Sequence, residues 1–126
     1  MNMCYEQFGR YFDQFDVGQI YSHATRKTIT ESDNNLFCLL TMNHHPVHLD
    51  AEFALDTIHK QILVVGTYVL SLIVGISVKD ISGKAIANLE YESIKHVGPV
   101  FVGDTLSAET KVLNKYLSKT NPKNGI

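Results

Sequence analysis

The 126-residue sequence contains no tryptophan, three prolines and two cysteines, and neither sign of charge dominates it. Eleven Lys and Arg side chains stand against thirteen Asp and Glu, for a formal net charge of −2 at pH 7. Nucleic-acid-binding domains and basic membrane-surface modules need an excess of Lys and Arg, so the composition excludes both. Two cysteines, Cys4 and Cys38, are too few to stabilise a small secreted fold through disulfides. Cys38 also stands in an apolar run that is typical of a buried thiol. Because residues 1–10 also lack the basic and apolar parts of a signal peptide, we expect a cytoplasmic protein.

Long hydrophobic runs are scarce, and only residues 62–78 approach the length of a membrane span. Small and polar residues such as Gly66 and Thr67 dilute this run, and neither an aromatic belt nor a basic cluster flanks it. A helix that is apolar on all sides can also form the buried centre of a soluble fold. We therefore expect a buried helix and no association with membranes.

The length and the 44% apolar content favour one domain over residues 1–126. Thr30, with an acidic residue three positions later, predicts the start of a helix through Leu40. A proline at position 46 ends this helical pattern, and a second, short helix is predicted after Asp50.

The remaining segments predict strands and turns. Residues 5–18 are aromatic-rich and irregular, and residues 20–29 alternate loosely enough to predict a first strand. A two-residue period over 85–92 and 105–112 predicts two more strands. Residues 121–125 predict a turn with no strand after it, so we expect that the C-terminal strands of the fold are missing. A strand, then helices that include the long apolar one, then further strands indicate an α+β fold with an antiparallel sheet around one central helix.

The densest group of titratable side chains lies in residues 43–50, and three interpretations compete for it. His45, His48 and Asp50 have a loose metal-ligand spacing, but no His-Glu-x-x-His helix or cysteine pair accompanies them, so we expect no metal. Alternatively, the imidazoles cap helix ends or face water. In the third interpretation His48 is an acid/base catalyst, since a histidine titrates near neutrality, and Asn43 is its polar partner across a bend.

A further element is Gly66, which opens the apolar helix. Unpaired N–H groups and the positive end of the helix dipole meet at such an N-terminus, where they can hold a carbonyl oxygen that gains negative charge. A base, an orienting amide and an oxyanion donor are the parts needed to add water across a double bond conjugated to a thioester.

Residues 43–54 resemble the signature of the MaoC-like dehydratases and R-specific enoyl-CoA hydratases, which runs Gly-Asp-x-Asn-Pro-Leu-His. Residues 29–33 and 98–106 are also similar to elements of that family, in the same order. The resemblance spans about residue 15 to the C-terminus. It implies a hot-dog fold, in which a curved antiparallel sheet wraps a long helix. It also implies acyl-CoA thioester substrates, homodimers or higher homo-oligomers with sites between subunits, and no cofactor besides the coenzyme A of the substrate.

Matched residue by residue, His48 falls on the catalytic histidine of the family and Gly66 on the glycine whose amide holds the thioester oxygen. Val65 and Thr67 flank that glycine and share the substrate-binding position. Asn43 falls on the catalytic aspartate of the family.

The sequence departs from the family pattern at two positions. Asn43 cannot take a proton, so we expect it to orient the attacking water while His48 is the titrating group. His45 stands where the family has asparagine. Asp33 or Asp50 could supply a carboxylate instead, although neither occupies the motif position.

The run Thr41-Met42-Asn43 is similar to a MaoC branch that acts on branched or dicarboxylic acyl-CoAs of the mesaconyl or itaconyl type. The expected function is therefore an enoyl-CoA hydratase, or a 3-hydroxyacyl-CoA dehydratase in the reverse direction. The alternatives are a non-catalytic hot-dog protein that binds acyl-CoA and a hot-dog thioesterase.

Overall fold

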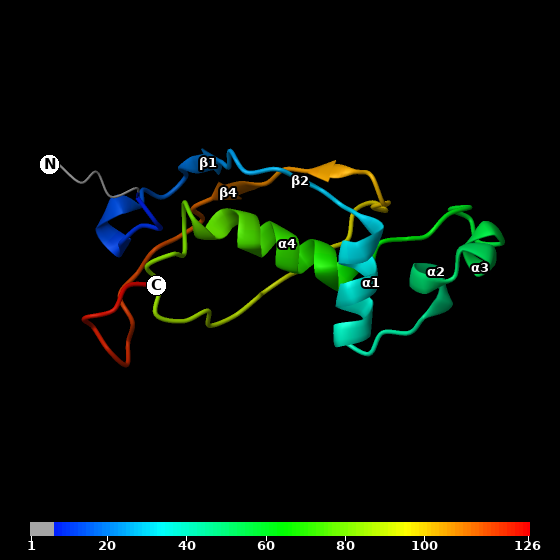
Figure 1. The fold of residues 1–126 in the computed structure, drawn as a ribbon. Helices are drawn as coiled ribbons and strands as arrows, with labels where there is room; N and C mark the ends of the chain where they lie inside the picture. Colours follow the sequence, from blue (N-terminus) through cyan, green and yellow to red (C-terminus); the bar gives the residue numbers. More distant parts are fainter. Residues whose placement is uncertain (1–6) are drawn as a thin grey trace, which may run out of the picture.

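The computed structural model describes residues 7–126, so Cys4 and the start of the aromatic-rich segment at Tyr5 lie outside the described residues. The elements follow one another along the chain as shown in Figure 1. They are η1 (Phe12–Gln14), β1 (Ile20–Ser22), β2 (Lys27–Thr28), α1 (Glu31–Leu40), α2 (Pro46–Leu49), α3 (Ala51–Leu55), α4 (Gly66–Val78), β3 (Thr105–Leu106) and β4 (Glu109–Lys111).

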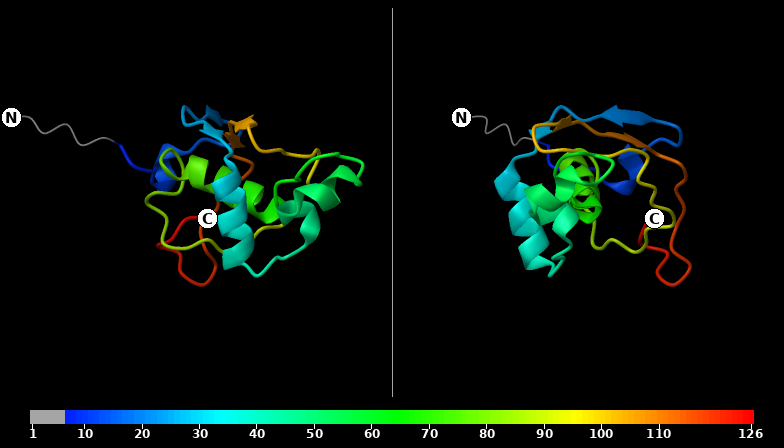
Figure 2. Two further views of the ribbon diagram at one scale, coloured as in Figure 1. Left: turned by 45° about the vertical axis from the view of Figure 1, so that its right-hand side comes forward. Right: turned by 90° about the vertical axis from the view of Figure 1, so that its right-hand side faces the viewer.

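Two short antiparallel ladders lie along one side of α4 (Figures 1 and 2). β1 pairs with β4, with Ile20 opposite Lys111, and β2 pairs with β3, with Thr28 opposite Thr105. The predicted α+β arrangement, with antiparallel strands against a long helix, is confirmed. The strands predicted over 20–29 and 105–112 are each interrupted, and each forms two short strands.

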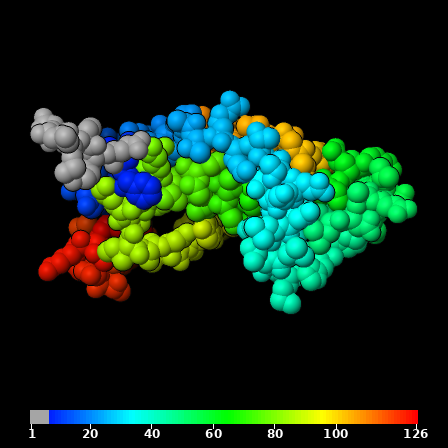
Figure 3. Space-filling view, in the orientation of Figure 1, coloured from blue at the N-terminus to red at the C-terminus, as the bar shows by residue number. Residues whose placement is uncertain are grey.

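The strand predicted over 85–92 is wrong, because this segment has no regular structure. Its alternating side chains are exposed, as Leu89 shows with 71% of its surface accessible. A strand is stabilised by hydrogen bonds to a neighbouring strand, and none runs beside this segment in the described part of the chain. In Figure 3 the segment crosses below α4 with an open gap between them.

The helix predicted from Thr30 is confirmed as α1. The Thr30 hydroxyl accepts from the Asp33 N–H at 3.2 Å, and the Asp33 carboxylate accepts from the Thr30 N–H at 2.9 Å. This reciprocal pair satisfies two donors that the helix start would otherwise leave unpaired. The short helix predicted after Asp50 is α3. Pro46 also begins a helix that was not predicted, α2, because proline is suited to a first helical position.

α4 begins at Gly66, four residues after the start of the apolar run. Leu63 instead forms an isolated antiparallel bridge with Phe101. The prediction of a helix buried on all sides is wrong for this chain: most of α4 is half-buried, and Ile76 is its one buried residue. Within residues 7–126, no helix combines the length and apolar character that a membrane span requires.

The predicted turn over 121–125 is confirmed, and it folds the last residues back on the chain. Tyr116 and Ile126 exchange both of their backbone hydrogen bonds, at 2.9 and 2.7 Å. The turn closes on an isolated bridge between Leu117 and Gly125, and no strand follows it within the described residues, as predicted.

The buried core is small and lies between α1, the segment before α4 and the ladders. Its apolar members are Ile29, Cys38, Ala54, Val64, Val65, Ile76 and Ala108. Two polar side chains, His23 and Asn34, are buried with them. Because Val64 and Val65 belong to this core, the chain that leads into α4 is held firmly against α1.

Candidate functional site

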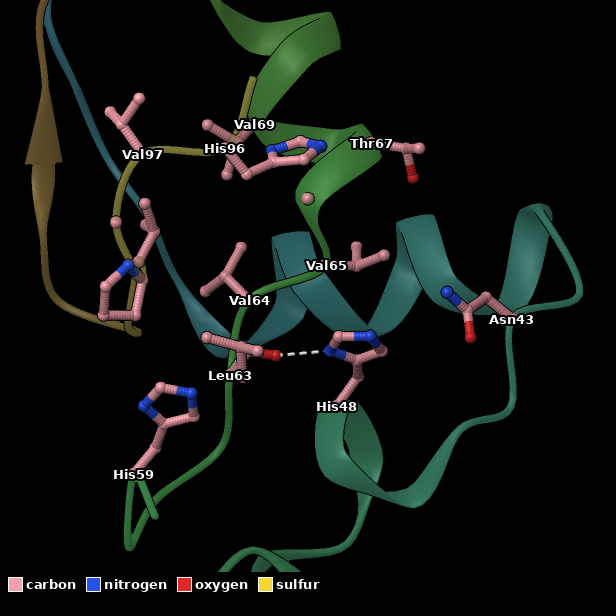
Figure 4. A pocket seen from close by; sticks show the side chains of 14 residues that line it. Asn43, His48, His59, Leu63, Val64, Val65, Thr67, Val69, His96 and Val97 are labelled. Atoms are coloured by element: carbon pink, nitrogen blue, oxygen red, sulfur yellow. Dashed lines mark hydrogen bonds between the residues drawn. The ribbon is translucent and has the colours of Figure 1, made fainter. Parts of the chain in front are cut away.

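A pocket of about 570 Å³ opens where the loop after α1, helix α2 and the start of α4 meet residues 96–100 (Figure 4). Its lining is mostly apolar, with three imidazoles, one amide and one hydroxyl among the polar groups. The lining residues are Asn43, His48, His59, Leu63, Val64, Val65, Gly66, Thr67, Val69, His96, Val97, Gly98, Pro99 and Val100. No acidic residue belongs to this lining within the described residues.

His48 is held in one orientation by a backbone carbonyl. Its Nδ1 lies 2.6 Å from the Leu63 carbonyl oxygen, which can only accept, so Nδ1 carries the proton. In the neutral ring the lone pair is then on Nε2. Figure 4 shows that Nε2 faces away from Leu63, toward the side on which Asn43 lies. His48 therefore presents a proton acceptor to the pocket.

The N-terminus of α4 forms another wall of the same pocket. Val65 is the N-cap residue, and no side chain caps the helix. Within the described residues, no protein acceptor takes the N–H of Gly66 or of Thr67. These donors lie at the positive end of a 13-residue helix, which favours an oxygen that carries negative charge.

Gly66 is also approached closely by a side chain. A Cβ atom at this position would lie 2.8 Å from Cε1 of His96, so the imidazole of His96 covers the first residue of α4. Any residue larger than glycine would push this ring aside.

Asn43 lines the pocket and is half-buried. Its Oδ1 accepts from the His45 N–H at 3.3 Å. No direct hydrogen bond joins Asn43 to His48 in the described part of the chain, but its Nδ2 stays available to a small molecule between them. Between Asn43 and His48 the chain is extended at His45 and turns into α2 at Pro46.

Asp33, Asp50 and His45 do not line the pocket, and each has a local structural role. Asp50 caps α3 through the Phe53 N–H at 2.9 Å, and His45 Nδ1 caps α2 through the Val47 N–H at 3.1 Å. The ammonium of Lys27, 2.8 Å away, and the hydrogen bonds from Thr30 lower the pKa of Asp33 to about 2. Neither carboxylate is therefore placed to act in the pocket.

The sequence interpretation missed three residues at this site: His59, His96 and Asn34. His59 and His96 stand alone in segments without a motif, so nothing local marks them. Asn34 lies four residues before Cys38, and this spacing places the two side chains on the same face of α1. The spacing could have predicted that Asn34 is buried beside Cys38, and the structure shows both fully buried.

The site offers a proton acceptor, an amide and helix N-terminal donors around one volume, which suits acid/base chemistry on a carbonyl compound. Among residues 7–126, no three His, Cys, Asp or Glu side chains are grouped as metal ligands.

Comparison with known proteins matches residues 14–126 to a family model described as a MaoC like domain. A β-methylmalyl-CoA dehydratase of Chloroflexus aurantiacus is 35% identical over 83% of this chain and 30% of its own length. A mesaconyl-CoA hydratase of Cereibacter sphaeroides is 33% identical over 83% of this chain and 31% of its own length. The solved unliganded R-hydratase of Pseudomonas aeruginosa superposes with a TM-score of 0.75 at 28% identity, over 86% of this chain and 68% of that one. The chain thus spans about a third of the length of those two curated relatives.

Proposed function

The chain belongs to the MaoC-like domain family and has the predicted hot-dog fold, and from this premise we propose that it is an enoyl-CoA hydratase. It adds water across the double bond of an enoyl thioester, and it removes water in the reverse direction. We also propose that residues 1–126 form a single MaoC-like domain.

One observation carries this proposal: His48 and Gly66 line the same pocket. The Nε2 lone pair of His48 and the free N–H groups of α4 face one volume of about 570 Å³, which is in the range of small-molecule sites. An enoyl thioester needs these two features, a base for water and a donor for the carbonyl oxygen.

In the proposed reaction, the thioester oxygen accepts a hydrogen bond from the Gly66 N–H. His48 Nε2 takes a proton from a water molecule, and the water oxygen bonds to the β-carbon. The π electrons move to the thioester oxygen, which becomes an enolate held by the helix N-terminus. His48 then returns the proton to the α-carbon, so that one water has been added in total.

Asn43 replaces a carboxylate in this scheme. Its free Nδ2 donates to the water oxygen and orients it, while His48 is the only group that changes protonation. The reaction uses side chains and backbone groups of this chain and the coenzyme A of the substrate, with no further cofactor.

For the acyl group, we propose a branched or dicarboxylic chain of the mesaconyl or itaconyl type. The names of the two curated relatives and the run Thr41-Met42-Asn43 support this class. We further propose a cytoplasmic homodimer or higher homo-oligomer.

The deciding experiment follows the absorbance of the conjugated enoyl thioester with crotonyl-, mesaconyl- and itaconyl-CoA. We expect turnover by the wild type and a loss of about 10²- to 10⁴-fold in kcat/KM for His48→Gln. His44→Gln is the matched control, because His44 is exposed and does not line the pocket, and it should keep wild-type activity. Equal rates for the two variants would refute the assignment of the base.

A second arm of the same experiment tests the oxyanion donor. Gly66→Pro removes the N–H from a first helical position, where proline is well tolerated, and Val65 already has a backbone compatible with a following proline (φ −63°, ψ 126°). Gly66→Ala adds the same Cβ beside His96 but keeps the N–H. We expect Gly66→Pro to have a kcat about 10²- to 10³-fold below that of Gly66→Ala.

Among residues 7–126 no carboxylate lines the pocket, and this favours, as a second candidate, an acyl-CoA-binding protein without catalysis. Saturable binding without turnover would select it. Release of free thiol from a saturated acyl-CoA would instead select a thioesterase, because a hydratase needs the double bond.

A further inference from the structure

Asn34 is a fully buried polar residue on α1 that contacts both halves of the candidate site. Its Nδ2 donates to the His48 carbonyl oxygen at 2.9 Å. Its Oδ1 accepts from the Val65 N–H at 3.0 Å and also lies 3.9 Å from the Cys38 sulfur. One amide therefore ties α1 to the backbone of the proposed base and to the N-cap residue of α4.

These bonds close into a ring. Asn34 holds the His48 carbonyl, and the His48 ring holds the Leu63 carbonyl at 2.6 Å. The chain then runs two residues to Val65, whose N–H returns to Asn34. The Leu63 N–H also donates to the Val47 carbonyl at 3.1 Å. This is a second hydrogen bond between α2 and the segment that leads into α4. Asn34, His48, Leu63 and Val65 thus form one hydrogen-bonded frame. This frame connects the imidazole to the start of α4.

The chemistry of the frame requires an amide at position 34. One partner is a carbonyl, which needs a donor, and the other is an N–H, which needs an acceptor. An aspartate keeps the acceptor but loses the donor, and an aliphatic residue loses both. Since Asn34 is fully buried, water cannot replace the lost partner without a rearrangement.

We propose that Asn34 is a positioning residue: it fixes the His48 imidazole and the N-terminal donors of α4 at the separation that the reaction needs. The catalytic part of this proposal rests on the proposed hydratase function, whereas the structural part does not.

The kinetic test compares Asn34→Asp and Asn34→Ser with Asn35→Asp and Asn35→Ser. Asn35 is the matched control, because it is the next residue on α1, it lies outside the pocket with His48, and its side chain makes no hydrogen bond in the described structure. Displacing reacting groups by about 1 Å costs up to about 100-fold in rate. We expect both Asn34 variants to lose about 10- to 100-fold in kcat, with KM close to that of the wild type, and the Asn35 variants to keep both constants.

A second readout needs no activity. The nitrogen-15 NMR shifts of the His48 ring report which nitrogen carries the proton. In the wild type we expect the proton on Nδ1, because Leu63 accepts it. When the frame is opened at Asn34, the ring should exchange between both tautomers, and the Asn35 variants should keep the wild-type shifts.

Loss of kcat together with a mixed tautomer supports the proposal. Wild-type shifts in folded Asn34 variants would overturn it, and so would an unchanged kcat in an enzyme that turns over. If the wild type hydrates no enoyl-CoA, the hydratase function fails while the tautomer readout still decides the role of Asn34. If neither Asn34 variant folds, the wild-type spectrum decides, and a proton on Nε2 of His48 would refute the frame.

Discussion

Asp33 shows how one side chain at a helix start can combine two stabilising roles. It completes the capping box with Thr30 and pairs with Lys27 at 2.8 Å. Both roles favour the ionised carboxylate, so the pKa of Asp33 falls to about 2 from its usual 3.8, and the pKa of Lys27 rises. The side chain is therefore a local contribution to stability rather than a catalytic acid.

We predict that this contribution depends on pH. A carboxyl group with a lowered pKa in the folded state stabilises the protein above its unfolded pKa of 3.8, and this stabilisation is lost as the pH falls toward about 2. The free energy of unfolding should therefore decline between pH 3.8 and about 2, and Asp33→Asn should remove the part of this decline that Asp33 causes. Urea denaturation at several pH values in this range measures it. Glu31→Gln, which removes a carboxylate of the same helix turn, is the control and should decline as the wild type does. An Asp33→Asn profile parallel to the wild type would contradict the prediction.

Single residues of the site were predictable only where a local pattern or the family signature marked them. His48 and Gly66 stand at positions that the resemblance assigns, and they line one pocket. His96 lies 30 residues from Gly66 and covers it only because the chain returns past α4. Such contacts depend on packing between distant segments, which residue spacing does not encode.

At the scale of the elements, hydrogen bonds of one buried histidine connect the end of α4 to the ladder of β1 and β4. His23 follows β1, and its ring lies between the Asp80 carboxylate just after α4 and the Thr110 hydroxyl of β4, each 2.7 Å away. A histidine whose side chain is 1% exposed needs both partners, because water cannot reach it.

We predict that Thr110→Val lowers the free energy of unfolding by about 1–3 kcal/mol, since it leaves a buried ring nitrogen unpaired. Thr105→Val is the control: it breaks the exposed Thr28–Thr105 hydroxyl pair and should cost less than about 0.5 kcal/mol. Urea denaturation of both variants gives the comparison. Similar losses for the two threonines would mean that the His23 network adds nothing to stability.

Elements were predictable where their stabilising contacts are local. The hydrogen bonds that start α1 lie within four residues, so Thr30 and Asp33 predict it. A strand depends on a partner elsewhere in the chain. Residues 105–112 find partners in 20–28, whereas 85–92 find none in this structure, although both segments alternate equally well.

At the scale of the whole molecule, much apolar surface remains uncovered. Ile86 and Leu89 are 87% and 71% exposed in the segment below α4, and α4 itself is only half-buried. Exposed apolar patches of this kind mark interaction surfaces.

We predict that the purified chain sediments as a homodimer or larger at micromolar concentration. Leu89→Lys should shift the distribution toward the monomer, because a buried ammonium opposes association. Ile58→Lys, at a 90% exposed side chain outside the segment below α4, should leave the distribution unchanged. A wild type that remains monomeric across the concentration range of the ultracentrifuge would refute the prediction.

The ring of bonds around Asn34 involves residues 34–65 alone, whereas the ladders join positions some 80 residues apart. Breaking the ladders therefore removes none of the three hydrogen bonds of this ring. Partial opening of the molecule should release the strand amides to solvent exchange first. The backbone amide of Val65 should exchange later, so that the hydrogen-bonded ring between His48 and the start of α4 persists after the ladders have opened.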